Sequence, residues 1–368
     1  MFGETGGLSS KLEELQEEYS KTKYNKATDK HLGLLRAKMA RLRREIAQSS
    51  SRRHGEGFFI KRGGDATVAL VGFPSAGKSS LLNVLSNAKS KTAPYAFTTV
   101  SIIPGTMIYN EAHIQIFDTP GLIGGAHAGI GGGRSVIGAL RATDLILFVI
   151  DINSVWQLGT LVEELRALSV YVGREKPRVT ITESQSYPKL VVDVNKSGLS
   201  NKVVETVCTG FGIHNASVKL ESELSEDELV SIVCGRAVYI RAIAALNKID
   251  LDPNYASIAR SIASRYGLRV VPVSATGPRN IDELRKSIYE QLNIITIYLE
   301  PESTGPREPM VLRQGSTIRD AANKIHTELI NDLRCAYVTG PSSKFPRQRV
   351  GADHVLKNGD VVRFMKQR

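Results

Sequence analysis

The sequence has few cysteines and no long apolar run, and both absences narrow the class of protein. Its three cysteines, Cys208, Cys234 and Cys335, lie far apart and form no C-x-x-C pair, so we expect reduced, buried or incidental thiols. No stretch of about 18 apolar residues occurs, and the opening MFGETGGLSS contains no apolar signal segment. We therefore expect a cytoplasmic protein.

Negative charge is scarce at the two ends of this chain of 368 residues, whose net charge is +11. Residues 1–62 hold 14 Lys and Arg against 8 Asp and Glu, and residues 301–368 hold 12 against 7. Residues 63–300 hold 22 of each kind. A positive excess confined to the terminal segments suggests that these segments face a polyanion. The length predicts roughly two to four domains.

Residues 68–82 read VALVGFPSAGKSSLL and place the pattern G-x-x-x-x-G-K-S between a strand-like and a helix-like segment. The glycines allow the backbone to curl around a phosphate chain, and the following helix adds its positive end. Lys78 suits the β- and γ-phosphates, and the Ser79 hydroxyl is a hard ligand for Mg²⁺. The alternative, a Gly-rich turn with a solvent-facing lysine, is disfavoured by the flanking segments. The expected phosphate-binding residues are Gly72, Phe73, Pro74, Ser75, Ala76, Gly77, Lys78, Ser79 and Ser80.

A second motif, Asp118-Thr119-Pro120-Gly121, follows an apolar strand expected at residues 112–117. We expect Asp118 to act on the metal, usually through water, and the Gly121 N–H to reach the γ-phosphate. The alternative is an ordinary turn at the end of a strand, because D-x-P-G is common turn chemistry. Its position after the phosphate loop favours the functional interpretation.

The loop at residues 89–100 contains two threonines, either of which can ligate Mg²⁺ when a third phosphate is present. Of Thr98 and Thr99 we favour Thr99. The expected metal ligands are therefore Ser79, Thr99 and Asp118. The expected catalytic groups are Lys78, Thr99 and Gly121.

Residues 122–134, LIGGAHAGIGGGR, are dense in glycine and are expected to be ordered only by a ligand, as a switch segment is. His127 in such a loop is not favoured as a general base. Leu122 and Ile123 lie where Ras-like GTPases carry a water-orienting Gln, which predicts slow intrinsic hydrolysis that a partner accelerates. A bound K⁺ could supply the missing charge, although related K⁺-using GTPases have Asn where this chain has Ser75.

A second cluster of expected ligand contacts follows two apolar strands further along the chain. The Asp250 carboxylate can accept two hydrogen bonds from guanine and would meet a lone pair on adenine, which predicts a preference for GTP over ATP. Asn247 can donate to the base N7, and the stem of Lys248 can cover the ring. In the segment Ser274-Ala275, the Ala275 N–H can reach the guanine O6.

Alternating strand and helix patterns predict a doubly wound α/β domain at residues 63–173 and 236–293. Residues 174–235 are long for a connection and are expected to form a small α+β subdomain. The order of strands and helix after residue 294 predicts a β-grasp module. We expect helices at residues 156–172, 200–211, 280–292 and 317–333, and strands at 66–71, 101–109, 112–117, 145–151, 214–220, 269–273, 335–339 and 360–365.

Residues 11–48 carry two apolar stripes at helical spacing, and residues 25–30 predict a turn between two helices. The second helix is basic, with Arg36, Lys38, Arg41, Arg43 and Arg44. A solvated face on a docking helix is the alternative to an RNA-binding surface, and the basic character of the other terminus favours RNA. Asp151 is expected only to end a strand, and His326 to lie on a helix without a functional role.

Together these motifs resemble those of the Obg-like GTPases, and specifically the developmentally regulated GTP-binding (DRG) family of archaea and eukaryotes. The resemblance covers nearly the whole chain and rests on GEGFFIKRGGDATVALVGFPSAGKSSLL, YAFTTV, DTPGLIGGA, IHNASVKL, AVYIRAIAALNKID and VGADHVLKNGDVVRF. The positions of this chain that match the family's functional residues are Gly72–Ser79, Thr99, Asp118–Gly121, Asn247–Asp250 and Ser274–Ala275.

The resemblance implies a translation-associated GTPase that acts on or near ribosomes. It also implies a helix-turn-helix region at residues 1–62, an inserted subdomain similar to domain 2 of ribosomal protein S5 at 174–235, and a TGS domain at 294–368. Two departures stand out. The family usually has Leu where this chain has Thr119, and the glycine-dense segment 122–134 is less basic than usual.

The first hypothesis is a Mg²⁺-dependent GTP-hydrolysing switch of low intrinsic turnover, whose basic terminal domains contact RNA or the ribosome. The alternative is a nucleotide-stabilised RNA- or ribosome-binding scaffold in which hydrolysis is incidental. An ATPase of the same superfamily is disfavoured by Asp250. We expect GTP or GDP and Mg²⁺ as ligands, with K⁺ left open. The ribosome or a structured RNA and a dedicated stabilising protein are the expected partners, membranes and DNA are not, and we expect a monomer.

Overall fold

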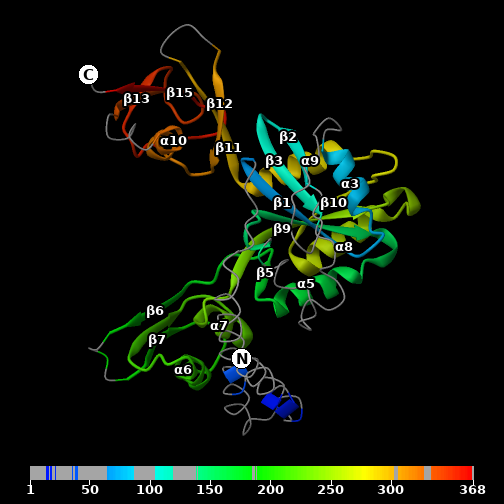
Figure 1. Cartoon of the computed structure of the whole chain (residues 1–368), viewed down its shortest axis with the longest axis vertical. Coiled ribbons are helices and arrows are strands. Elements are labelled where there is room, and N and C mark those ends of the chain that lie inside the picture. Colours follow the sequence, from blue (N-terminus) through cyan, green and yellow to red (C-terminus); the bar gives the residue numbers. More distant parts are fainter. Residues whose placement is uncertain are drawn as a thin grey trace, which may run out of the picture. The chain divides into compact units, whose positions relative to one another are not determined.

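The protein is represented by a computed structural model (Figure 1). The structure describes residues 14, 15, 17, 18, 21, 35, 38, 39, 64–86, 104–118, 138, 140–184, 187, 189–301, 306–326 and 333–366. The chain divides into two compact units, one formed by residues 1–59 with 162–239 and the other by residues 60–161 with 240–368. Each unit contains its own buried core.

The largest sheet has seven strands, in the order β10-β9-β4-β1-β3-β2, with β5 paired to β9. Its strands are β1 (Ala66–Val71), β2 (Pro104–Tyr109), β3 (Ala112–Asp118), β4 (Leu145–Asp151), β5 (Val170–Val172), β9 (Val238–Asn247) and β10 (Arg269–Pro272). The pairings among β10, β9, β4, β1 and β3 are parallel, and β2 runs antiparallel to β3 at the edge. The doubly wound α/β fold expected from the sequence is confirmed.

The central strands are apolar along their whole length because helices cover both faces of a parallel sheet. All six residues of β1 are buried, and six of the seven residues of β4 are buried as well. Since parallel strands end at the same edge, the segments that follow β1, β3, β4 and β9 lie at one edge of the sheet. This arrangement brings together motifs that are far apart in the sequence.

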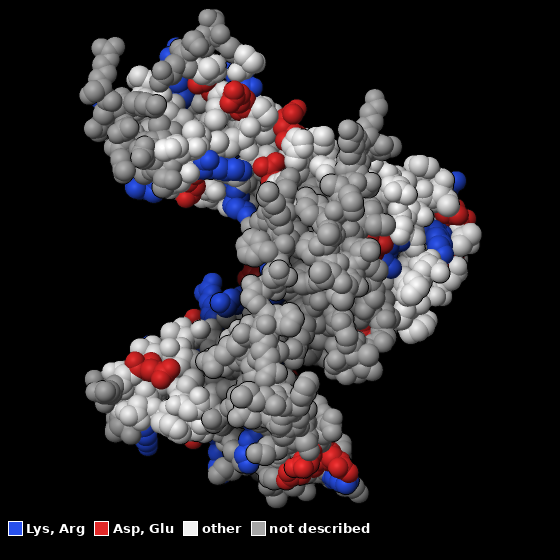
Figure 2. Space-filling view, viewed as in Figure 1, with Lys and Arg blue, Asp and Glu red and all other residues white. Residues whose placement is uncertain are grey.

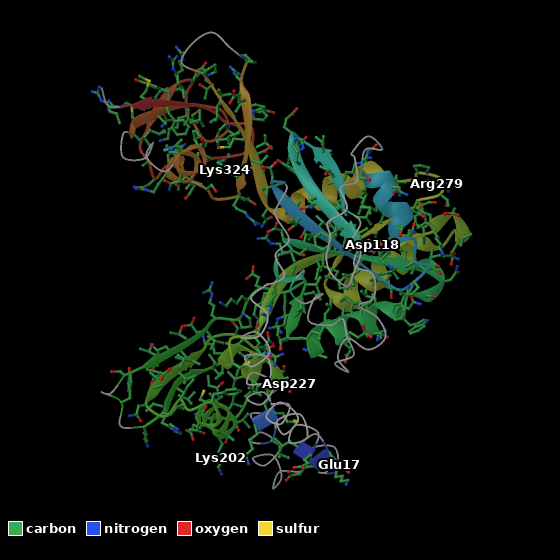
Figure 3. All side chains as sticks on the ribbon, in the orientation of Figure 1. Glu17, Asp118, Lys202, Asp227, Arg279 and Lys324 are labelled. Carbon is green, nitrogen blue, oxygen red and sulfur yellow. The ribbon has the colours of Figure 1, made fainter. Side chains whose placement is uncertain are left out.

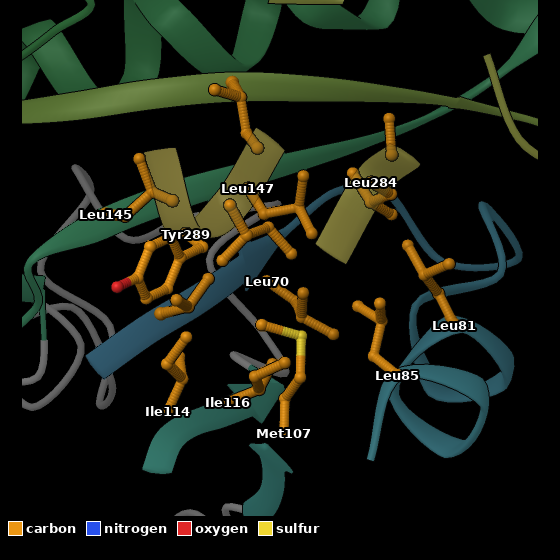
Figure 4. Close-up of a cluster of buried hydrophobic side chains, with 14 of the residues drawn as sticks. Leu70, Leu81, Leu85, Met107, Ile114, Ile116, Leu145, Leu147, Leu284 and Tyr289 are labelled. Atoms are coloured by element: carbon orange, nitrogen blue, oxygen red, sulfur yellow. The ribbon is translucent and has the colours of Figure 1, made fainter. Parts of the chain in front are cut away.

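Helices α3 (Lys78–Leu85), α5 (Gln157–Ala167), α8 (Tyr255–Tyr266) and α9 (Ile281–Leu292) belong to this part of the chain. Leu81 and Leu85 of α3 meet Leu284 of α9 and the sheet residue Met107 in one buried cluster (Figure 4). Fully burying one such side chain stabilises the fold by about 1.5–3 kcal/mol. The cluster therefore fixes the helix that follows the phosphate loop against the sheet.

The C-terminal segment forms a five-stranded sheet in the order β12-β11-β15-β13-β14. Its elements are β11 (Ile294–Leu299), β12 (Glu308–Arg313), α10 (Ile318–Ile325), β13 (Leu333–Thr339), β14 (Gln348–Val350) and β15 (Val361–Lys366). Thr317 and Asp320 form a reciprocal capping box at the start of α10. The mixed sheet with one helix agrees with the β-grasp expectation, and β14 is a strand that the sequence did not indicate.

This segment contacts the part of the seven-stranded sheet and its connections that lies in the same unit. Arg313 of β12 forms an ion pair with Asp144, whose side chain is 8% exposed. The Tyr289 hydroxyl lies 3.2 Å from the Thr296 hydroxyl and donates to Asn358 at 3.1 Å. Thr296 also donates to the Asn110 carbonyl at 2.8 Å. One edge of the C-terminal sheet is thereby covered.

The other unit contains a three-stranded sheet in the order β6-β8-β7. Its elements are β6 (Val179–Glu183), β7 (Val191–Asn195), α6 (Asn201–Gly210), β8 (Ala216–Leu220) and α7 (Glu226–Val233). Ser200 and Ser225 cap the two helices by accepting hydrogen bonds from backbone N–H groups three residues on. The expected domain boundaries, and the likeness of residues 174–235 to a ribosomal protein domain, stay predictions.

Two helices end earlier than the sequence predicted. The helix expected at residues 156–172 stops at Ala167, because Ser169 adopts a left-handed conformation with φ 61° and residues 170–172 form β5. The helix expected at residues 317–333 stops at Ile325, and His326 is extended, with φ −160° and ψ 135°. His326 therefore follows a helix and does not lie on one. The N-terminal hairpin falls almost wholly outside the described residues.

A buried carboxylate organises the end of the inserted segment. Glu228 is fully buried, accepts from Arg174 at 2.9 Å and from the Tyr239 hydroxyl at 2.9 Å. The rings of Tyr239 and Tyr171 stack with centroids 5.2 Å apart. Burial and the hydrogen bond to the Glu228 carboxylate raise the pKa of Tyr239 well above its ordinary value. The phenol therefore stays protonated and donates.

Replacing Glu228 with Ala is expected to lower the free energy of unfolding by about 1–3 kcal/mol, because the half-buried Tyr239 hydroxyl loses its acceptor and the partly exposed Arg174 loses its ion pair. Urea unfolding followed by circular dichroism measures the change. Glu221→Ala removes an exposed carboxylate of the same unit and should cost less than about 0.5 kcal/mol. Equal effects of the two substitutions would show that the buried network is not stabilising.

Candidate nucleotide-binding site

The phosphate loop joins the end of β1 to the start of α3 and needs glycine at two positions. A Cβ atom on Gly72 would collide with the carbonyl oxygen of Val149. Gly77 has φ 92° and a Cβ there would collide with the amide of Asn247. Side chains other than hydrogen are therefore excluded by neighbouring strands as well as by backbone conformation.

Lys78 closes the loop onto itself. Its Nζ donates to the carbonyl oxygens of Gly72 at 3.0 Å and Phe73 at 3.2 Å. The side chain thus lies over the loop, where its positive charge faces the curled backbone. Phosphate oxygens placed in the loop would be stronger acceptors for this ammonium than the two neutral carbonyls.

Ser79 and Asp118 come from different elements and meet at the edge of the sheet. The Ser79 hydroxyl donates to Asp118 Oδ2 at 3.1 Å, and Figure 3 shows Asp118 at the end of β3. The second oxygen, Oδ1, is buried and has no hydrogen-bond partner among the described residues. A hydroxyl beside a carboxylate with a spare oxygen is a donor set that fits Mg²⁺.

This donor set is small compared with a metal site built wholly from protein ligands. Within the part of the chain that the structure describes, no group of three or more His, Cys, Asp or Glu residues could hold a metal ion. Mg²⁺ commonly takes only one or two protein ligands and completes its shell with water and substrate phosphates. The pair therefore fits a magnesium ion that arrives with a nucleotide.

Asn247 joins the phosphate loop to the segment after β10. Its side chain is 1% exposed, donates to the Ala76 carbonyl at 2.9 Å and accepts from the Ala275 N–H at 3.2 Å. The sequence indicated a base contact for Asn247 and gave no sign of this bridge. The amide has a second N–H, so the expected base contact stays a prediction alongside the bridge.

Lys248 is held by a residue to which the sequence assigned no such role. Its Nζ lies 2.7 Å from Asp151 Oδ2, and its backbone is left-handed, with φ 64°. Burial raises the pKa of Asp151, but hydrogen bonds from Lys248 and the Asn153 N–H outweigh it and keep the net value low. Asp151 therefore does more than end β4, because its charge fixes the direction of the Lys248 stem.

Asp250 is an exposed carboxylate fixed in place by a buried hydroxyl. Ser274 is fully buried, and its hydroxyl donates to Asp250 Oδ1 at 2.6 Å. This hydrogen bond lowers the pKa of Asp250, with smaller contributions from charges that include Arg279. The group is thus an ionised acceptor that faces solvent at neutral pH.

The structure brings the described members of the two sequence clusters together through Asn247. Five of the expected site residues, Thr98, Thr99, Thr119, Pro120 and Gly121, lie outside the described residues, as do residues 122–134. Their roles stay predictions. The phosphate loop also contains one member of an aromatic pair that the sequence did not indicate. The ring centroids of Phe73 and Trp156 lie 6.1 Å apart, and Trp156 is 68% exposed.

Most of the chain matches models of known protein families. The family model described as a 50S ribosome-binding GTPase matches residues 67–184, the C-terminal region of the same domain matches 188–294, and the TGS domain matches 295–366. Developmentally-regulated GTP-binding protein 1 of Xenopus laevis is 37% identical over 369 residues, which cover 98% of this chain and 100% of that protein. The chain belongs to the developmentally regulated GTP-binding (DRG) family.

Two further relatives and one solved structure are similar to this chain. A GTP-binding protein of Methanocaldococcus jannaschii is 38% identical over 372 residues, covering 100% of this chain and 95% of that protein. Developmentally-regulated GTP-binding protein 1 homolog of Dictyostelium discoideum is 36% identical over 372 residues, covering 98% of this chain and all of that protein. The solved YchF GTPase of Schizosaccharomyces pombe covers 83% of this chain and 99% of that chain, with a TM-score of 0.48 and 16% identity.

Membership of the DRG family confirms the GTPase and TGS expectations. The protein is a GTPase whose G domain binds GTP and GDP, followed by a C-terminal TGS domain. Within the described residues, no helix has the length and apolar character needed to span a membrane.

Replacing Asn247 with Ala is expected to weaken the binding of both GTP and GDP. The substitution removes the side chain that links the phosphate loop to the segment that carries Ala275. It leaves two backbone groups unpaired, so the free energy of unfolding should fall by about 2–3 kcal/mol. Calorimetric titration and urea unfolding test the two effects. Asn254→Ala removes an amide that makes no capping hydrogen bond and serves as the control. Unchanged binding in the Asn247 variant would show that the bridge is dispensable.

Proposed function

We propose that this DRG-family protein is a magnesium-dependent GTP-hydrolysing switch that acts on the ribosome and turns over slowly by itself. The observation that carries the proposal is the pair formed by Ser79 and Asp118, with one buried carboxylate oxygen left without a partner. It lies after the phosphate loop that Lys78 covers, where a nucleotide-bound Mg²⁺ is required. Magnesium, when bound, would offset negative charge on the β- and γ-phosphates.

We propose that the remaining contacts to the phosphates and the metal come from Lys78, Thr99 and Gly121. Lys78 can leave the two loop carbonyls and pair with phosphate oxygens, so that its charge is held ready near the transferred group. We propose that Thr99 ligates the metal and that the Gly121 N–H binds the γ-phosphate. The apolar Leu122 and Ile123 provide no hydrogen bond to an attacking water. A slow basal rate follows.

Guanine selectivity is proposed to rest on Asp250. The Ser274 hydroxyl fixes one carboxylate oxygen and keeps the group ionised, so that it accepts from the guanine N1–H and N2–H₂ groups. Lys248, directed by Asp151, covers one face of the ring. The Ala275 N–H, which donates to Asn247 in this structure, is then shared with the guanine O6 or turns toward it. Adenine offers no matching pair of donors, and an unpaired carboxylate opposes its binding.

Ribosome association is supported by the charge distribution and by the description of the matching family model. The whole net charge of +11 comes from residues 1–62 and 301–368. On the described surface of residues 63–300, Lys and Arg are interspersed with Asp and Glu, as Figure 2 shows for one side. The matching family model is described as a 50S ribosome-binding GTPase. Basic ends are suited to the polyanionic surface of ribosomal RNA. We further propose a cytoplasmic location, K⁺ as an optional activator and a stabilising protein partner.

Replacing Asp250 with Asn should turn the base preference from guanine to xanthine, because the amide donates where the carboxylate accepts. GTP affinity is expected to fall by about 100-fold or more, and affinity for xanthosine triphosphate to rise. Calorimetric titration with both nucleotides measures the change. Asp252→Asn, two residues on, should leave the preference unaltered. An Asp250 variant that keeps its preference for GTP would contradict the assignment.

Single-turnover hydrolysis measured with and without ribosomes tests the switch itself. With Mg²⁺ present we expect ribosomes to accelerate hydrolysis by at least about tenfold, because they order residues 122–134 around the γ-phosphate. Chelating Mg²⁺ should abolish both rates, and replacing Na⁺ by K⁺ tests the activating cation. A rate that ribosomes leave unchanged would favour the scaffold hypothesis, in which hydrolysis is incidental.

A further inference from the structure

The segment that leaves β4 touches the phosphate loop at two places. The carbonyl oxygen of Val149 lies so close to Gly72 that a Cβ atom there would collide with it. Trp156 stands directly before α5, and its ring centroid lies 6.1 Å from that of Phe73, with 55° between the ring planes. Tilted aromatic pairs at this separation attract each other. The first two residues of the phosphate loop are thus both in contact with this segment.

Phe73 begins a tight turn whose backbone is strained. Its carbonyl oxygen accepts from the Ala76 N–H at 3.3 Å and from Lys78 Nζ at 3.2 Å. Pro74 and Ser75 occupy the two central positions, and Ser75 is left-handed, with φ 65°. Glycine or asparagine is usual at this place in such a turn, and serine is disfavoured there. Contacts from outside the loop are therefore needed to hold the turn in this shape.

Trp156 contributes little to the hydrophobic core. Its side chain is 68% exposed, the largest fraction among the exposed large apolar side chains of the described residues. A ring that stays in water gains little from the hydrophobic effect. Its backbone is nevertheless well held, because the Trp156 carbonyl accepts from the Gly159 N–H at 3.2 Å and Leu158 is fully buried. The ring is thus a fixed support whose described contact is with Phe73.

The same segment is anchored at the base-reading end of the site. Asp151 pairs with Lys248 at 2.7 Å and accepts from the Asn153 N–H at 2.9 Å. These contacts fix the short 3-10 turn η1 (Ile152–Ser154), in which Ile152 is buried. Trp156 follows this turn closely. Its ring therefore stands on a short connection that is held at both ends.

We propose that Trp156 is a positioning residue for GTP and GDP. Its ring holds Phe73, and with it the strained turn, in the shape that accepts phosphates. A loop that adopts this shape only part of the time binds more weakly by that fraction. The ring thus raises affinity by lowering the cost of ordering the loop when a nucleotide binds. This role depends only on nucleotide binding, and it is independent of the proposed ribosome association.

Calorimetric titration of Trp156→Leu with GTP, GDP and inosine triphosphate tests the proposal on the full chain. The affinity for all three is expected to fall by the same factor, about threefold to tenfold, which is the range that an aromatic pair contributes. Inosine lacks the 2-amino group that Asp250 is proposed to bind. An unchanged ratio of the GTP and inosine triphosphate affinities therefore places the effect at the phosphate end. Trp156→Phe keeps a ring and should restore most of the affinity.

Intrinsic fluorescence gives a second readout, because Trp156 is the only tryptophan of the chain. Phosphate oxygens are stronger acceptors for Lys78 than the Phe73 carbonyl, so nucleotide binding should shift the ring pair. We expect the emission of the wild type to change when GDP and Mg²⁺ are added, and to saturate with the dissociation constant found by calorimetry. Phe73→Leu should reduce this change. The wild-type measurement tests the proposal even if Trp156→Leu impairs folding.

The matched control is Phe345→Leu. Phe345 is 58% exposed and lies in the TGS domain, so the substitution removes a similarly exposed ring outside the nucleotide site. Nucleotide affinity and the emission response should both stay as in the wild type. Thermal unfolding followed by circular dichroism should give Trp156→Leu nearly the melting temperature of the wild type, because the lost ring is mostly in solvent.

Unchanged nucleotide affinity in Trp156→Leu would overturn the proposal, as would wild-type emission that does not respond to nucleotide. A loss of affinity for GTP that inosine triphosphate does not share would place the residue at the base end and contradict it equally. Loss of ribosome-stimulated hydrolysis with nucleotide affinity intact would assign the exposed ring to a partner. In each case the wild-type titrations report separately whether the protein binds GTP.

Discussion

The buried side chain of Asn247 is the contact on which the nucleotide site depends. It bonds to the phosphate loop through Ala76 and to the segment after β10 through Ala275, and it fills the space beside Gly77 where a Cβ would collide. A triphosphate needs the loop at one end and the base-reading segment at the other. One amide links the two segments, so their separation is set before any ligand arrives.

The two residues proposed to read the base are likewise held by neighbouring side chains. Lys248 and Asp250 are directed by residues that do not themselves face the ligand, Asp151 and Ser274. Such partners restrict long side chains to one geometry, so less conformational entropy is lost when the base binds. The acidic pKa of the Asp250 carboxyl is lowered by the same contact that orients it. Orientation and charge state therefore have one physical cause.

The TGS sheet is packed on both sides where it meets the G domain. Strands β11 and β12 contribute Thr296 and Val311 to the contact with the G domain. Ile297 and Leu312 of the same two strands face the core that α10 covers on the other side. Because side chains alternate along a strand, the same two strands complete the TGS core and join the two domains.

The sequence by itself determined the α/β class and located the phosphate loop and the proposed guanine-reading motif, because these depend on residue identity at short fixed spacings and on the apolar pattern of buried strands. Only the tertiary structure decided which residues support them. Asn247 reaches Ala76 across 171 positions and Lys248 reaches Asp151 across 97, and such pairs depend on strand order. The early end of α5 has the same origin, since residues 170–172 pair with β9 instead of continuing the helix.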